Sequence, residues 1–388
     1  MNEASRALLV YGYQPSGHSA AAFAIEEAGR KAGFAFSSIN IAADHHPAAG
    51  SAIAQGYHGL LRAAPGLYGA LYRGPWARSV LKAVRGAYLS LGGARRLRKG
   101  VRRSGAAVVV CPQAAVAAVL AEARRRGDLE IPVVSVLTDY GAHPFWADPP
   151  ADLILAPDEV AVAALAAHGV PRSRLRATGI PVSPAFAERL PREQARRFLA
   201  LPPSAPAALL SGGGKGLGGL DRLALALLSA SPRAHLLVLC GANDRVRAAL
   251  CAHRESGARL RVFGPQPSEL VAAMMAAADL HVGKPGGLSA AESLASGLPM
   301  VLTEPLPGQE EANARFLLGA GAAIDGGSPE RAARAAAALL LDRAALAELS
   351  ERARAAGRPG AADDAVSEIA ALLASQRGGS AAAGVSPG

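Results

Sequence analysis

Short apolar runs alternate with longer segments of helical periodicity along the first half of the chain. The runs have the length of buried strands. The segments between them carry apolar side chains at the spacing of three and four residues that is typical of amphipathic helices. The predicted strands are 7–11, 107–111, 132–137 and 153–156, and the predicted helices are 19–31, 114–126 and 160–168. Strands that alternate with helices indicate a parallel sheet of the α/β class.

This rhythm breaks at 183–206 and then restarts. Three prolines fall within residues 201–206, which is typical of a boundary between domains. The second set of predicted strands is 207–210, 235–240, 260–263, 280–282 and 299–302, and the second set of helices is 220–229, 269–277, 288–296, 311–318, 329–341 and 343–355. We therefore predict two Rossmann-like domains, 1–183 and 207–375, a linker at 184–206 and a disordered tail at 376–388. Parallel sheets bind ligands at the carboxyl ends of their strands, so we expect the two domains to face each other across a cleft.

The positive charge is concentrated in one region. The chain has a net charge of +10, yet residues 45–121 contain no Asp or Glu and hold eleven Lys or Arg. The remainder is close to neutral, which predicts that one region of an otherwise ordinary soluble body meets an anionic partner. The three cysteines are widely spaced and predict neither a disulfide framework nor a metal site.

The strongest chemical signal is the run 283–300, which follows a predicted strand and opens a helix. Gly286 and Gly287 allow close backbone approach, Ser289 can cap or donate, and the helix N-terminus offers unpaired N–H groups. Lys284 adds a cation, so the segment suits a diphosphate. Glu292, one turn into the helix, could accept both hydroxyls of a ribose. The alternative is a plain strand–turn–helix junction.

Two neighbouring loops extend this candidate site. In 305–313, Gln309 and Glu310 precede a predicted helix and could bind sugar hydroxyls, with Asn313 closing the segment. Alternatively, they cap that helix. The glycine-rich loop 212–219 also joins a strand to a helix, as phosphate-cradling loops do. Its candidate binding residues are Gly212, Gly213, Gly214 and Lys215. It is not a Walker loop, because Gly216 follows the lysine.

The first domain supplies candidates for proton transfer. His18 opens a helix after the first strand, and Asp139 and His143 lie on the loop after the third strand. An imidazole or a carboxylate could accept a proton from an acceptor hydroxyl. As a metal site the Asp139–His143 pair is weak, since no third ligand follows by spacing. A lone histidine is more often structural.

The basic region mixes apolar and cationic residues at helical spacing. Such stretches bind anionic membrane surfaces, and nucleic acid or a merely solvated face are the alternatives. No recognisable nucleic-acid reader accompanies it, so a membrane is favoured. The candidate membrane-binding residues are Arg73, Trp76, Arg78, Lys82, Arg85, Arg95, Arg96, Arg98 and Lys99.

Several of these motifs, in this order, resemble the GT-B glycosyltransferases of family 28. The similarity is greatest to monogalactosyldiacylglycerol synthases and processive diacylglycerol β-glucosyltransferases. It rests on residues 17–21, Thr138-Asp139 with His143-Pro144, 178–182, the glycines at 212–214 and the run 284–300.

The resemblance implies an inverting transfer of glucose or galactose from a UDP-sugar to diacylglycerol, with UDP as leaving group and no metal or other cofactor. His18 or Asp139 would be the base, and Phe263 would mark where the uracil is held. We expect a peripheral enzyme on the cytoplasmic face of the cell membrane, since the chain has no apolar run of about 18 residues and its start does not resemble a signal peptide.

Three alternatives remain open from the residues. One is the related N-acetylglucosaminyltransferase of peptidoglycan precursor synthesis, which has a polyprenyl acceptor. Another is a UDP-sugar 2-epimerase, which shares the fold but does not need a basic apolar surface. The third is a non-catalytic binder of lipid surfaces, which would not bind UDP.

Overall fold

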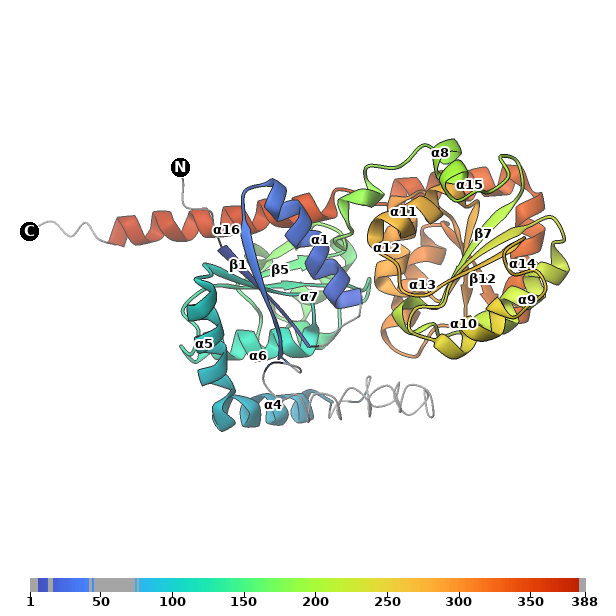
Figure 1. Cartoon of the computed structure of the whole chain (residues 1–388). Coiled ribbons are helices and arrows are strands. Elements are labelled where there is room, and N and C mark those ends of the chain that lie inside the picture. Colours follow the sequence, from blue (N-terminus) through green and yellow to red (C-terminus); the bar gives the residue numbers. More distant parts are fainter. Residues whose placement is uncertain (1–5, 13–16, 42–43, 45–73, 75–76, 384–388) are drawn as a thin grey trace, which may run out of the picture. The chain divides into compact units, whose positions relative to one another are not determined.

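The computed structural model of the chain describes residues 6–12, 17–41, 44, 74 and 77–383. It divides into two compact units (Figure 1). The first comprises Met1–Pro181 and Gly360–Gly388, and the second comprises Val182–Pro359. Each unit contains one six-stranded sheet in which all neighbouring strands run parallel. The predicted α/β class with two Rossmann-like domains is therefore confirmed.

The sheet of the first unit has the strand order β2-β1-β3-β4-β5-β6. Its strands are β1 (Arg6–Tyr11), β2 (Ala35–Asn40), β3 (Val108–Cys111), β4 (Val133–Val136), β5 (Leu153–Ala156) and β6 (Leu175–Ala177). Its helices are α1 (Gly17–Lys31), α4 (Ala77–Tyr88), η2 (Leu89–Gly93), α5 (Ala94–Ser104), α6 (Ala114–Arg125), η3 (Pro144–Trp146), α7 (Glu159–Ala167), η4 (Arg172–Arg174) and α16 (Ala361–Ala383).

Helices cover both faces of this sheet. Successive side chains of a strand point to opposite faces, so each strand contributes to two cores. Leu8 and Val10 of β1 join the core that contains Leu97 of α5 and Leu120 of α6. The alternate residues of β1 join a second core with side chains of α1 and α16. Strands that are buried on both faces need continuous apolar runs, which is why β3, β4 and β5 could be predicted.

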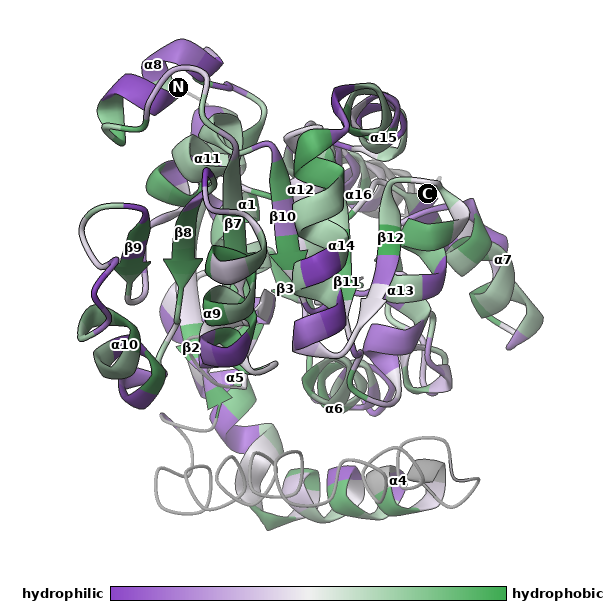
Figure 2. Ribbon diagram, turned by 90° about the vertical axis from the view of Figure 1, so that its right-hand side faces the viewer, coloured by the Kyte–Doolittle hydropathy of each residue, from purple (hydrophilic) through white to green (hydrophobic). Residues whose placement is uncertain are grey.

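The sheet of the second unit has the order β12-β11-β10-β7-β8-β9. Its strands are β7 (Ala207–Ser211), β8 (His235–Leu239), β9 (Leu260–Phe263), β10 (Leu280–Gly283), β11 (Met300–Thr303) and β12 (Ala323–Gly327). Its helices are η5 (Pro184–Phe186), α8 (Arg192–Phe198), η6 (Gly213–Lys215), α9 (Leu220–Ala230), α10 (Asp244–Cys251), α11 (Ser268–Ala277), α12 (Gly287–Ala295), α13 (Gln309–Gly319), α14 (Pro329–Leu341) and α15 (Arg343–Ala356). Figure 2 shows hydrophobic residues in its central strands, whereas α8 is largely hydrophilic.

Each sheet reverses its strand order at an internal strand. The order changes direction between β1 and β3 in the first unit and between β7 and β10 in the second. Open α/β sheets bind ligands beside such a switch point, at the carboxyl ends of the strands. The loops that follow β1, β3, β7 and β10 are therefore the places to look for function.

The domain bounds differ from those predicted at three places. Residues 184–206 belong to the second unit and contain η5 and α8, so they are not a separate linker. Residues 361–375 belong to the first unit and not to the second. The helix α16 extends through the predicted disordered tail to Ala383, and residues 384–388 lie outside the described residues.

Candidate functional site

The run that follows β10 lies at the switch point of the second unit, beside the glycine-rich loop that follows β7. α12 begins at Gly287, and its N-cap residue Gly286 provides no side chain to satisfy the first N–H groups of the helix. Free N–H groups and the positive end of the helix dipole together favour an anion. The predicted binding residues Gly286, Gly287 and Ser289 all lie at this helix end.

The glycine-rich loop requires glycine for two reasons. Gly213, Gly216, Gly218 and Gly219 have positive φ angles. A Cβ on Gly216 would lie 2.0 Å from the Cys240 carbonyl oxygen, so no side chain fits there. The loop carbonyls accept hydrogen bonds from the next loop, including Asn243 Nδ2 to Gly216 O at 2.9 Å. The backbone of the loop is thereby held in one shape.

Lys284 is held by an ion pair that the sequence did not predict. Its Nζ lies 2.7 Å from Glu310 Oε1, and both side chains are largely buried. The other oxygen of Glu310 accepts the Leu306 N–H at 2.7 Å. Each carboxylate oxygen of Glu310 thus has one protein partner, and its role as a ligand of sugar hydroxyls stays a prediction.

Three other predicted donor-binding residues, Asn313, Gln309 and Phe263, lie at the ends of elements of the second unit or have structural contacts. Asn313 is fully buried, and its Nδ2 donates to the Pro285 carbonyl at 3.0 Å. This bond fixes the turn between Lys284 and α12. Gln309 is the first residue of α13. Phe263 ends β9, and its carbonyl accepts the Cys240 N–H at 2.9 Å.

Glu292 is a partly buried carboxyl group in the second turn of α12. Within the described part of the chain, its carboxyl group has neither a hydrogen bond nor an ion pair. Burial raises the pKa of this group to about 8, because desolvation penalises the charged form. A carboxyl group held protonated and without a protein partner is chemically suited to bind the hydroxyl groups of a ligand.

Sequence reasoning missed His281, which lies in β10 and is fully buried. Its Nε2 lies 2.8 Å from Ser211 Oγ and its Nδ1 lies 2.7 Å from Ser293 Oγ. Burial lowers the pKa of His281 to about 4, so the ring is neutral near pH 7. The imidazole thus joins the end of β7 to α12. The sequence did not indicate this role, because His281 is the one polar residue of an apolar run.

His18 lies at the switch point of the first unit. Its Nδ1 is 2.8 Å from Oγ1 of the buried Thr138, which follows β4. Burial lowers the pKa of His18 to about 4, and a hydrogen bond to the Pro112 backbone opposes this shift. Gln113, which the sequence did not suggest, accepts the Gly12 N–H at 2.7 Å and so joins the loops after β1 and β3.

His143 has a local structural role. Its Nδ1 accepts the Phe145 N–H at 3.2 Å and so caps the short helix η3. Its ring also meets the Phe145 ring edge-on, with 4.0 Å between centroids. Asp139 directly follows Thr138, the partner of His18, so His18 and Asp139 belong to neighbouring positions at the carboxyl edge of the first sheet.

The predicted membrane-binding region divides into parts with different roles. Arg73 and Trp76 lie outside the described residues, as does the side chain of Arg78. The prediction that Arg85 binds the membrane is wrong. It is 4% exposed, donates to the Asp148 carbonyl at 2.7 Å and lies 4.0 Å from Glu122, so it is committed to the core.

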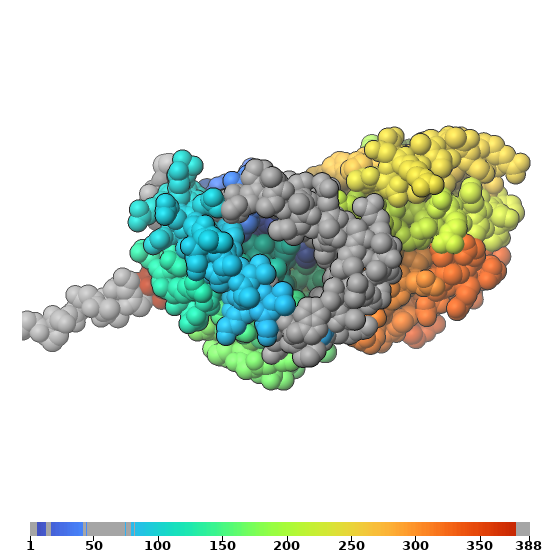
Figure 3. Space-filling model, turned by 90° about the horizontal axis from the view of Figure 1, so that it is seen from below, coloured from blue at the N-terminus to red at the C-terminus, as the bar shows by residue number. Residues whose placement is uncertain are grey.

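The outer face of α4 is apolar and basic. Val80 is 49% exposed and Val84 is 60% exposed, and Lys82 is exposed on the same helix. Residues from α4 to α5 form a continuous stretch of the surface of the first unit (Figure 3).

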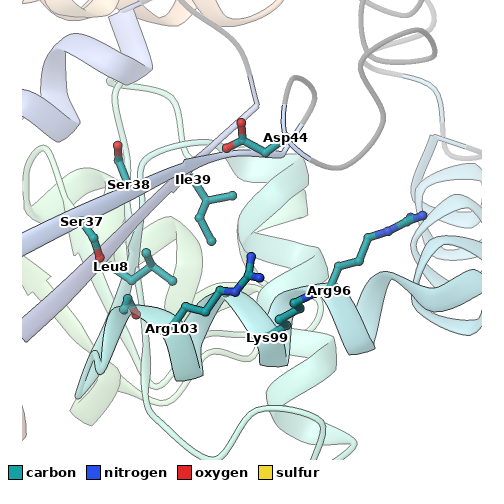
Figure 4. A pocket seen from close by; sticks show the side chains of 10 residues that line it. Leu8, Ser37, Ser38, Ile39, Asp44, Arg96, Lys99 and Arg103 are labelled. Carbon is teal, nitrogen blue, oxygen red and sulfur yellow. The ribbon is translucent and has the colours of Figure 1, made fainter.

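A cavity of about 510 Å³ lies between β2 and α5. Arg96, Lys99 and Arg103 of α5 line it together with Ser37 and Ser38 of β2 (Figure 4). Arg98 instead faces Asp128, with 3.9 Å between the charged groups. Arg95 is exposed on the same helix. The cations of α5 thus divide between a basic pocket and a different face of the helix.

Two features are absent from the described residues. No helix there is both long and apolar enough to cross a bilayer. No group of three or more His, Cys, Asp or Glu side chains there is arranged to hold a metal ion.

Each unit is similar to one known family. Residues 18–182 match the family described as monogalactosyldiacylglycerol (MGDG) synthase, and residues 215–357 match glycosyl transferases group 1. The processive diacylglycerol β-glucosyltransferase of Bacillus subtilis is 31% identical over 226 residues, or 58% of each chain. That of Staphylococcus carnosus is 30% identical over 58% of this chain and 57% of its own. Monogalactosyldiacylglycerol synthase 3 of Arabidopsis thaliana is 32% identical over 63% of this chain and 54% of its own. The match therefore spans little more than half the length of these relatives.

Solved structures extend the likeness over almost the whole chain. MurG of Acinetobacter baumannii aligns with a TM-score of 0.57 at 20% identity, covering 95% of this chain and 99% of its own. The UDP-GlcNAc 2-epimerase of Neisseria meningitidis aligns with a TM-score of 0.60 at 14% identity, covering 95% and 100%. At such identities these structures show the fold alone. The predicted resemblance to family 28 is thus supported: residues 18–182 are similar to the monogalactosyldiacylglycerol synthase family, residues 215–357 are similar to glycosyl transferases group 1, and the fold is GT-B.

Proposed function

We propose that this protein transfers glucose or galactose from a UDP-sugar to diacylglycerol at an anionic membrane surface, with inversion at the anomeric carbon. The second unit would bind the donor, and the first unit would bind the acceptor and the membrane. The relatives named for diacylglycerol glycosylation support the acceptor class.

One observation above all supports a nucleotide-sugar donor. At the switch point of the second sheet, Glu292, whose carboxyl group has no partner among the described residues, lies on a helix whose N-terminus has no side-chain cap. The helix end and Lys284 suit the diphosphate, and Glu292 suits the ribose hydroxyls. The diphosphate gains a further negative charge as it leaves, and preorganised N–H groups and a cation would stabilise that charge.

The chemistry requires one base and no cofactor. The acceptor hydroxyl oxygen attacks the anomeric carbon as the bond from that carbon to the diphosphate breaks, and UDP leaves with the bonding electrons. The hydroxyl proton passes to a base, for which His18 and Asp139 are the candidates. The ring of His18 is neutral at pH 7, because burial lowers its pKa to about 4, and its Nδ1 lies 2.8 Å from Thr138 Oγ1.

The membrane part of the proposal rests on α4 and α5. Val80 and Val84 present apolar surface that a bilayer interface would bury, and Lys82, Lys99 and Arg103 present positive charge. A reaction on diacylglycerol needs such contact because its acceptor does not leave the bilayer.

Radiolabelled donors test the proposal. Purified protein should convert UDP-glucose or UDP-galactose into lipid-soluble label on liposomes that contain diacylglycerol and phosphatidylglycerol. Lipid-soluble label from neither donor would refute it. Label transferred only from UDP-N-acetylglucosamine to a polyprenyl acceptor, or a donor epimerised without transfer, would support the two enzyme alternatives instead.

Two variants separate the roles of the units. Glu292→Ala should weaken UDP binding by about 1–3 kcal/mol, since hydroxyl contacts are lost. His18→Ala should lower turnover and leave UDP affinity unchanged. If turnover survives in His18→Ala, the base is another group, and Asp139 is tested next.

A further inference from the structure

Thr303 carries a buried hydroxyl group without a partner. It is the last residue of β11 and is 2% exposed. Among the described residues, nothing forms a hydrogen bond with its Oγ1. An unpaired buried hydroxyl destabilises a fold, and a valine of nearly the same shape would avoid that penalty.

The hydroxyl lies at the candidate donor site. Thr303 ends the strand next to β10, so it is adjacent to Lys284 at the carboxyl edge of the sheet. A Cβ built on Gly218 would lie 3.6 Å from Thr303 Oγ1 and 3.0 Å from Lys284 Cγ. The threonine hydroxyl, the lysine side chain and the glycine-rich loop therefore converge on one point.

The pairing of Lys284 explains why this point is closed in the structure. Its ammonium group is held 2.7 Å from the Glu310 carboxylate, and its aliphatic part runs past Gly218. A diphosphate at the N-terminus of α12 would compete with Glu310 for the same cation. If Lys284 turned to a phosphate oxygen, its aliphatic part would no longer cover the place where the hydroxyl lies.

We propose that Thr303 is a further ligand of the donor, whose hydroxyl group donates a hydrogen bond to a diphosphate oxygen when Lys284 exchanges Glu310 for that diphosphate. The inference rests on the proposed function, because it assumes a nucleoside diphosphate at this site. The competing explanation is that the hydroxyl of Thr303 stabilises the fold. Its removal would then lower the stability of the unliganded protein.

Two substitutions at this position test the proposal. Thr303→Val should leave the melting temperature of the unliganded protein unchanged or raise it, and should weaken UDP binding in calorimetry about tenfold or more, as expected for a lost bond to a charged acceptor. Uridine, which has no phosphate, should bind Thr303→Val and the natural protein equally. Thr303→Ser keeps a hydroxyl and should restore UDP affinity.

Thr178→Val is the matched control. Thr178 is a buried threonine of the first unit whose hydroxyl donates to the Gly179 carbonyl at 3.3 Å. This control should lower the melting temperature and keep UDP affinity. Unchanged UDP affinity in Thr303→Val, an equal loss of uridine affinity, or a fall in melting temperature like that of the control would each overturn the assignment. If the natural protein binds no UDP at all, the proposed function itself has failed.

Discussion

Glu292 makes a prediction about pH, because its carboxyl group is protonated near neutral pH in the unliganded protein. Its pKa is raised to about 8 by burial, and two ribose hydroxyls that donate to it would favour the ionised form and lower that pKa. Binding then releases a proton below pH 8. The affinity for UDP-glucose should therefore rise from pH 6 to pH 8, by at most about tenfold for each pH unit, and level off above pH 8.

Glu292→Gln is the control for this pH dependence. The amide keeps the shape of the side chain but does not titrate, so its affinity for UDP-glucose should be lower and nearly constant over the same range. Calorimetry in buffers of different ionisation enthalpy would also detect the released proton. An equally steep profile in Glu292→Gln would assign the titration to another group.

At the scale of residues, sequence patterns identify chemical groups but not their partners. The run 283–300 singles out Lys284 and Glu292 because glycines, a cation and a carboxyl group meet at one helix end. The pairing of Lys284 with Glu310 joins positions 26 apart and depends on the packing of α13. His281 and Thr303 escape notice because each is a single polar residue in an otherwise apolar strand, and only burial shows that it needs a partner.

The helix α4 makes a prediction about membranes at the scale of an element. Its exposed valines, Val80 and Val84, are four residues apart and so share one face, whereas the exposed Lys82 lies on another face of the helix. Replacing both valines by serine should weaken binding to vesicles of phosphatidylglycerol and diacylglycerol about ten- to hundredfold, because two apolar side chains no longer enter the interface. Sedimentation with vesicles measures this.

Leu341→Ser provides the matched control for α4. Leu341 is 78% exposed in the second unit, away from the basic region of the sequence. Its substitution should leave vesicle binding unchanged. Binding of the natural protein should also weaken with added salt, since Lys82, Lys99 and Arg103 would meet anionic headgroups. An equal loss in Leu341→Ser would mean that general surface hydrophobicity, and not α4, drives the adsorption.

Two strands that the sequence failed to predict share a physical cause. β2 is an edge strand whose residues Ser37 and Ser38 are exposed, so it lacks the apolar run of a central strand. β12 is the edge strand of the other sheet and includes Asp325 and two glycines. Edge strands are paired on one side only and can be polar, so periodicity does not reveal them.

At the scale of the whole molecule, the chain completes its first unit with its last helix. Residues of α16, including Val366 and Ile369, join the core formed by β1 and α1. Figure 1 shows α16 alongside α1 in this unit. The predicted domain limit at 375 fails because local patterning identifies α16 as amphipathic at most, and only tertiary contacts decide which sheet it covers. The first unit is therefore incomplete until residues 361–373 have been synthesised.

The dependence of the first unit on α16 leads to a prediction about stability. Ile369 is 2% exposed, and its truncation in Ile369→Ala should reduce the unfolding free energy of the first unit by about 2–4 kcal/mol, since a buried aliphatic group is lost and a cavity remains. Amide hydrogen exchange should then quicken in β1 and β3 but not in β7 and β10, although Ile369 lies more than 150 residues after β7 in the sequence. The neighbouring residue Glu368 forms an exposed ion pair with Arg176 at 3.0 Å, so Glu368→Ala should change stability by less than about 1 kcal/mol. Faster exchange in β7 and β10 of Ile369→Ala would mean that α16 stabilises the second unit, and the assignment of this helix to the first unit would then be wrong.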